Sequence, residues 1–126
     1  MDMKTLPPNT DTLRLIGLPV YPQAKIVSVN EVRQHIGPAN VDTLIAMIST
    51  NDDETAVENF YMKKFPNAQR STMPVSHAVR IMVSPPQSPE QKIVNVMPAR
   101  AGVGVVIQLM HTRVILPSPA PSPTSS

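Results

Sequence analysis

The stretch from Asn51 to Pro66, NDDETAVENFYMKKFP, constrains the fold most, because it is the one segment with a clear amphipathic helical pattern. Asn51 is placed to cap the first turn, and Glu54 follows three residues later, as in a capping box. The lysines at 63–64 suit the negative end of a helix dipole, and Pro66 ends the helix. One helix with defined ends is therefore predicted here.

The apolar side chains of this helix recur at three- and four-residue spacing, which places them on one face: Ala56, Val57, Phe60 and Tyr61, with Phe65 just beyond. The chain has only four aromatic residues, two Phe and two Tyr, so three of them lie in this one segment. This face is the predicted nucleus of the core.

The remaining ordered segments predict strands. β-branched or alternating residues run through Lys25 to Ile36, Val41 to Thr50, Val75 to Val83, Lys92 to Met97 and Gly104 to Ile115. The first of these ends at Gly37-Pro38 and suggests a bulge, and the second is apolar on both alternate sets, which favours a central strand. The last two are joined by PARAGV, so they predict an antiparallel hairpin.

The fold class predicted from this order is α+β: a curved, largely antiparallel five-stranded sheet with one helix packed on one face, in the order strand, strand, helix, strand, strand, strand. Residues 1–18 are predicted to be an extended N-terminal arm, and 19–116 a single domain. Residues 117–126, rich in proline and serine, predict a disordered tail.

Composition excludes several classes of function. The net charge is only +2, the basic residues are scattered, and the predicted strands contain no aromatic residue that could stack on a base, so no nucleic-acid partner is predicted. The absence of cysteine removes disulfides and thiolate chemistry. No segment approaches the apolar length of a membrane span, and the N-terminus lacks a signal-peptide pattern, so an unprocessed chain would be cytoplasmic.

From Leu18 onward the chain resembles a poorly characterised bacterial domain found in envelope proteins and lipoproteins. The resemblance rests on the proline-flanked tyrosine in LPVYPQA (18–24), the acidic TNDD (50–53), VENFY (57–61) with Phe65-Pro66, and the glycine-bearing GVGVVIQL (102–109). It implies a small α+β fold, a non-catalytic role and, as an alternative location, the periplasm or cell envelope.

No enzyme signature and no cofactor or metal site is predicted from the residues. His35, His77 and His111 each stand alone inside a predicted strand, although His77 and His111 could meet across neighbouring strands. The acidic run 52–54 is explained by the helix dipole rather than by a cation site.

A sheet covered by one helix leaves its other face without internal cover. The apolar residues predicted on that face, and hence to contact a partner, are Met82, Val94, Val106, Met110 and Val114. The predicted function is therefore a non-enzymatic accessory or structural subunit that docks on a larger protein assembly through a sheet face or edge and its extended termini, with a membrane-associated assembly among the candidate partners. Two alternatives stay open: strand curvature closes the sheet around these residues, or the chain is a soluble ligand-binding module of the cell envelope.

Overall fold

The computed structural model describes residues 2–84, 88–99 and 104–115. Its strands are β1 (Asp2–Leu6), β2 (Lys25–Ile36), β3 (Ala39–Thr50), β4 (Gln69–Thr72), β5 (Val79–Met82), β6 (Glu90–Val96) and β7 (Val105–Ile115), and its helices are α1 (Thr10–Arg14) and α2 (Glu54–Lys64). All seven strands form one antiparallel sheet in the order β1-β2-β3-β7-β6-β5-β4.

The predicted five-stranded α+β fold with a single helix is therefore wrong, since this is a seven-stranded sheet with two short helices. The predicted extended arm is also wrong: β1 pairs with β2, and the segment after it forms α1. The second missed strand, β4, is four exposed polar residues that pair only with β5. The Pro/Ser-rich tail lies outside the described residues.

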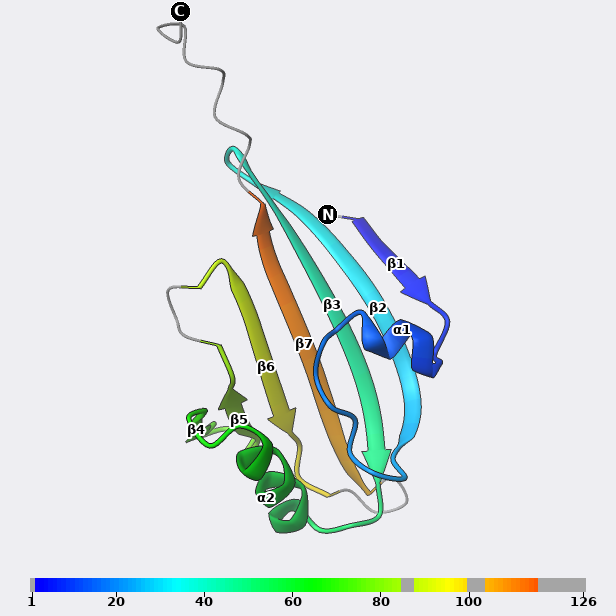
Figure 1. Ribbon diagram of the computed structural model, residues 1–126, viewed down its shortest axis with the longest axis vertical. Coiled ribbons are helices and arrows are strands. Elements are labelled where there is room, and N and C mark those ends of the chain that lie inside the picture. The colour runs from blue at the N-terminus through cyan, green and yellow to red at the C-terminus, as the bar shows by residue number, and fades with distance from the viewer. Residues whose placement is uncertain (1, 85–87, 100–103, 116–126) are drawn as a thin grey trace, which may run out of the picture.

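Both helices and the segment between α1 and β2 lie on the same side of the sheet (Figure 1). The buried apolar residues of the sheet all point toward this cover: Val29, Ala46, Ile48, Val79, Ile81, Val94, Val96, Val105, Ile107 and Leu109. The cover contributes its own buried side chains: Leu13, Ile16, Leu18, Tyr21, Val57 and Tyr61. The core is thus one layer between the sheet and this cover, and we call this side the covered face.

The helix α2 matches the sequence prediction in position but differs in its cap. Asp53, rather than Asn51, is the N-cap residue, and its Oδ1 accepts a hydrogen bond from the Ala56 amide at 2.7 Å. Glu54 does not close a capping box, because its Oε1 accepts from the Ala99 amide at 2.9 Å. Val57 and Tyr61 are fully buried, so the predicted apolar face does form part of the core.

Tyr21 and Tyr61 hold the cover together. The Tyr61 hydroxyl donates to the Pro19 carbonyl at 2.9 Å, and the Tyr21 hydroxyl donates to the Asp52 carboxylate. The ring of Phe60 packs edge-on against both tyrosine rings, with centroids 5.2 Å and 5.0 Å away. The segment before β2 is fixed to α2 by these contacts.

Burial raises the pKa of Tyr61, and the hydrogen bond to Asp52 raises the pKa of Tyr21. Both tyrosines therefore remain protonated in the folded chain at pH values where free tyrosine has begun to ionise.

Three of the predicted strands have the right bounds or the right partner. β2 spans Lys25–Ile36, as predicted, and its register shifts between Ile26 and Ser28, which is the expected bulge. β6 and β7 pair antiparallel as the predicted hairpin requires, although most of its connection lies outside the described residues. The predicted strand from Val75 is wrong in its first half: Val75 is 91% exposed, and the strand begins at Val79.

Candidate functional site

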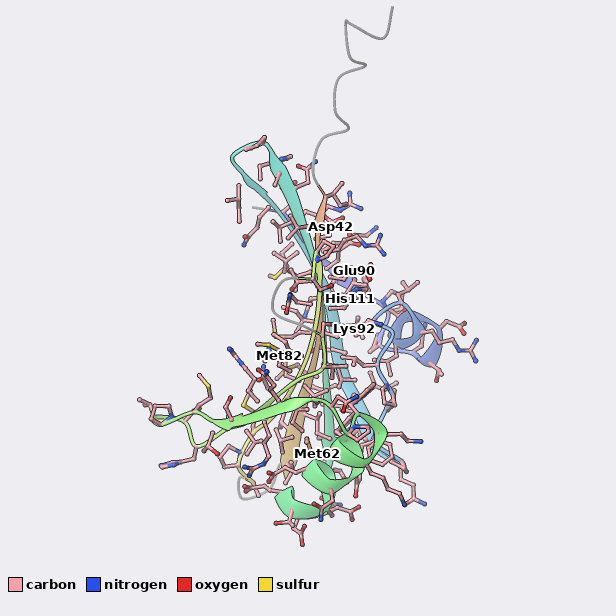
Figure 2. All side chains as sticks on the ribbon, turned by 60° about the vertical axis from the view of Figure 1, so that its left-hand side comes forward. Asp42, Met62, Met82, Glu90, Lys92 and His111 are labelled. Carbon is pink, nitrogen blue, oxygen red and sulfur yellow. The ribbon has the colours of Figure 1, made fainter. Side chains whose placement is uncertain are left out.

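The side of the sheet opposite the helices carries the other alternate set of strand residues, and neither helix lies over it (Figure 1 and Figure 2); we call it the open face. Figure 2 shows the sheet nearly edge-on, with Met82 on the opposite side from Lys92, His111 and α1. Residues of the open face are placed by the strand register, because side chains alternate between the two faces.

A row of apolar side chains crosses the open face in register. Ile45 of β3 lies opposite Met110 of β7, Met110 opposite Ile93 of β6, and Ile93 opposite Met82 of β5. All four side chains are only partly buried. We call these four residues the apolar stripe, since directly opposed residues on one sheet face are in side-chain contact.

Other apolar residues of the open face lie beside the stripe. Val32, Val41, Met47, Val106 and Val114 alternate with hydroxyl and amide side chains such as Thr43, Gln108 and Thr112. The surface is therefore mixed apolar and neutral polar, and three of its apolar members are flexible methionines, which adapt to differently shaped surfaces.

The charges of the chain are distributed unevenly between the two faces. All nine acidic residues are described, and none lies on the open face: Asp2, Glu31, Asp42 and Glu90 are on the covered face, Asp11 is in α1, and the remaining four lie between 52 and 58. Among the described strand residues, the open face carries two charged side chains, Lys25 at the start of β2 and Arg80 in β5. Depletion of charge is typical of the centre of protein interfaces rather than of free surface.

Arg80 lies next to a polar pair on the open face. Asn95, opposite Arg80, is 8% exposed, and its Nδ2 donates to Gln108 Oε1 at 2.9 Å and toward Met110 Sδ at 3.6 Å. The Arg80 Nε is buried and has no hydrogen-bond partner in the part of the chain that the structure describes. Arg80 is therefore a half-buried cation beside the apolar stripe.

The five residues predicted to contact a partner do not all lie on the open face. The register places Met82, Val106, Met110 and Val114 there. Val94 is placed wrongly by the prediction: it lies opposite Leu109 and Ile81, is fully buried and belongs to the core. Sequence reasoning also missed Ile93, because β6 is apolar on both alternate sets and only its register shows which set faces the core.

On the covered face, the part of the sheet away from the core carries a set of charged side chains and one histidine. We call this set the charged cluster: Glu31, Arg33, Asp42, Glu90, His111 and Arg113. Arg33 Nε lies 3.7 Å from Asp42 Oδ1, and Arg113 Nε lies 3.1 Å from Glu90 Oε1. The His111 side chain is 11% exposed, with Nε2 3.8 Å from Glu90 Oε1. The members of the cluster other than Glu90 line a pocket of about 320 Å³, and the cross-strand pairs compensate one another's charge.

The histidines do not meet. His35 is on β2, His111 is on β7, and His77 lies in the turn before β5 with φ of 60° rather than in a strand. The described residues contain no group of three His, Cys, Asp or Glu side chains placed to hold a metal ion. Neither helix has the length and apolar character that crossing a membrane would need, as far as the described residues go.

Comparisons with protein-family models, with curated proteins and with solved structures gave no match to this chain. The resemblance to a bacterial envelope domain stays a prediction, as does the absence of enzyme activity.

Proposed function

We propose that this chain is a non-enzymatic accessory subunit that docks on a larger protein assembly through the open face of its sheet. The observation that carries the proposal is the apolar stripe, Ile45, Met110, Ile93 and Met82, which stays partly exposed on the side opposite both helices (Figure 1), where no acidic residue lies. Contiguous exposed apolar surface of this kind marks interaction sites.

Charge placement supports the same proposal. A face selected only for solubility would carry charges of both signs, as the covered face does beyond its helices. Here the exposed side carries neutral amides, hydroxyls and apolar groups. Such a surface loses little hydration on contact with another protein, since few charged groups have to be desolvated.

The proposal concerns the face and not the termini. Residues 2–6 are already used in pairing with β2, so an N-terminal arm free for docking is not part of it. The two sheet edges are β1 and β4, both short, and both carry mostly polar residues, which disfavours edge-to-edge pairing.

The test is co-purification from the native source with the full chain and two variants. Met110→Glu places a charge in the middle of the apolar stripe, and Leu15→Glu changes a more exposed apolar residue, 61% exposed, on the helix side. A central interface residue contributes about 2 kcal/mol or more, so Met110→Glu should weaken the complex by roughly 30-fold or more, while Leu15→Glu retains it. Urea unfolding of each variant confirms that it is folded.

The proposal fails if Met110→Glu recovers the same partners in the same amounts as the unmodified chain. It also fails if both variants lose them equally, since the loss would then not depend on the open face.

A further inference from the structure

The open face contains a cation for which the described chain supplies no counter-charge. Arg80 is partly buried in β5, between Val79 and Ile81 of the core, so its side chain is directed to the open face. Within the described residues its Nε has no hydrogen-bond partner, and none of the ion pairs formed there includes its guanidinium. A buried guanidinium N–H without an acceptor is unfavourable, because its hydration has been lost and not replaced.

The other described arginines differ from Arg80 in both exposure and pairing. Arg14, Arg33, Arg70 and Arg113 are 47% to 77% exposed, and each lies within 4 Å of a carboxylate. Arg80 is less exposed than these four arginines, and no carboxylate of the described residues forms an ion pair with it. The residues across the ladder from it are Ser71 and Asn95, and the Asn95 amide already binds Gln108.

A second copy of this chain would not supply the missing group. Two copies packed through their open faces would bring together two surfaces without any acidic residue, because all nine carboxylate side chains lie on the covered face or in the segments at the helices. Such a pairing would bury Arg80 of each copy further while leaving both without a counter-charge, and burial of an unpaired charge opposes association.

We infer that the partner is a different protein, which lays an apolar surface on the stripe and presents an Asp or Glu side chain to the Arg80 guanidinium. This inference rests on the proposed function and specifies its partner. The stripe supplies apolar contact, and Arg80, two residues from Met82 on the same face of β5 and opposite Asn95, selects for the carboxylate by a charge-assisted, bidentate hydrogen bond. Lys25 at the rim of the same face adds to the attraction for an acidic partner.

The test is selection of a random 12-residue display library on the immobilised full chain, followed by sequencing. Peptides that bind the open face are recognised because they lose binding to Met110→Glu. Among these peptides we expect both apolar residues and Asp or Glu to be enriched over the unselected library. We also expect them to bind Arg80→Gln at least about tenfold more weakly than the unmodified chain, since the charge-assisted pair is lost. Arg80→Lys should recover part of the affinity, and Arg113→Gln, on the covered face, should change nothing.

The outcomes separate the two proposals. Peptides that depend on Met110 but show no acidic enrichment and bind Arg80→Gln equally well would overturn this inference and leave the open face as the docking surface. A concentration-dependent dimer of the chain, abolished by Met110→Glu and unaffected by Arg80→Gln, would also overturn it. A selection that yields no peptide dependent on Met110 would overturn the proposed function and the inference together.

Discussion

Leu109 and Met110 are neighbours in β7, and the fold predicts very different costs for truncating them. Leu109 is fully buried on the covered face, between Ala46 and Val94 of the adjacent strands. Those strands are fixed by their ladders and can close little of the space left behind, so Leu109→Ala should destabilise the fold by about 3 kcal/mol or more, within the range of such truncations. Met110 is partly exposed on the open face, so Met110→Ala should cost about 1 kcal/mol.

Urea unfolding followed by circular dichroism measures the difference. A gap of roughly 2 kcal/mol corresponds to about 1 M in the urea midpoint, with similar slopes for both variants. Equal losses, or a larger loss for Met110→Ala, would refute the assignment of the two faces, because a one-residue change of register exchanges every side chain between them. The apolar stripe would then not lie on the open face, and docking through it would be excluded.

Three further variants or conditions test the cover and the turns. Gly104→Ala should destabilise the fold by more than about 1 kcal/mol, because the φ of Gly104 is +79° and a Cβ there would lie 2.5 Å from the Thr50 carbonyl oxygen. Gly37→Ala should cost less, because Gly37 has a φ of +60° but no atom lies within 4 Å of the added Cβ. Equal urea midpoints for the two variants would contradict this. Tyr61→Phe should cost about 1 to 3 kcal/mol by leaving the partly buried Pro19 carbonyl without its donor, and thermal unfolding within error of the unmodified chain would exclude that role. Because the folded pKa of Tyr61 is raised, its contribution to the free energy of unfolding should be fully present below about pH 10, the unfolded pKa of tyrosine, and be lost as the pH rises above it. Tyr61→Phe should therefore show a smaller fall in stability between about pH 9 and 11, and parallel curves would count against burial as the cause.

The sequence predicts the elements that burial shapes and misses those that pairing alone holds. β2 and α2 have strong periodicity, and their positions follow from it. β1 and β4 are mostly exposed edge strands whose residues, DMKTL and QRST, carry no alternating apolar pattern. Their structure comes from hydrogen bonds to β2 and β5, which no local pattern encodes.

The candidate site was predictable only in part, and Val94 shows why. In KIVNVM the apolar residues occupy both alternate sets, so the sequence leaves open whether Ile93 or Val94 faces the core. Pairing with Leu109 settles this, since Leu109 and Val94 share the covered face. The separation of charge between the faces likewise becomes visible only when the registers of all strands are known.

Site-specific cross-linking tests the central claim most directly. The chain has no cysteine, so single cysteines at Met110, Ile45 and, as the control, Leu15 can carry a benzophenone group without interference. In extracts of the native source, the account predicts one discrete adduct from Met110 and Ile45 and none from Leu15. An adduct that forms from Leu15 and not from either position of the apolar stripe would contradict docking through the open face.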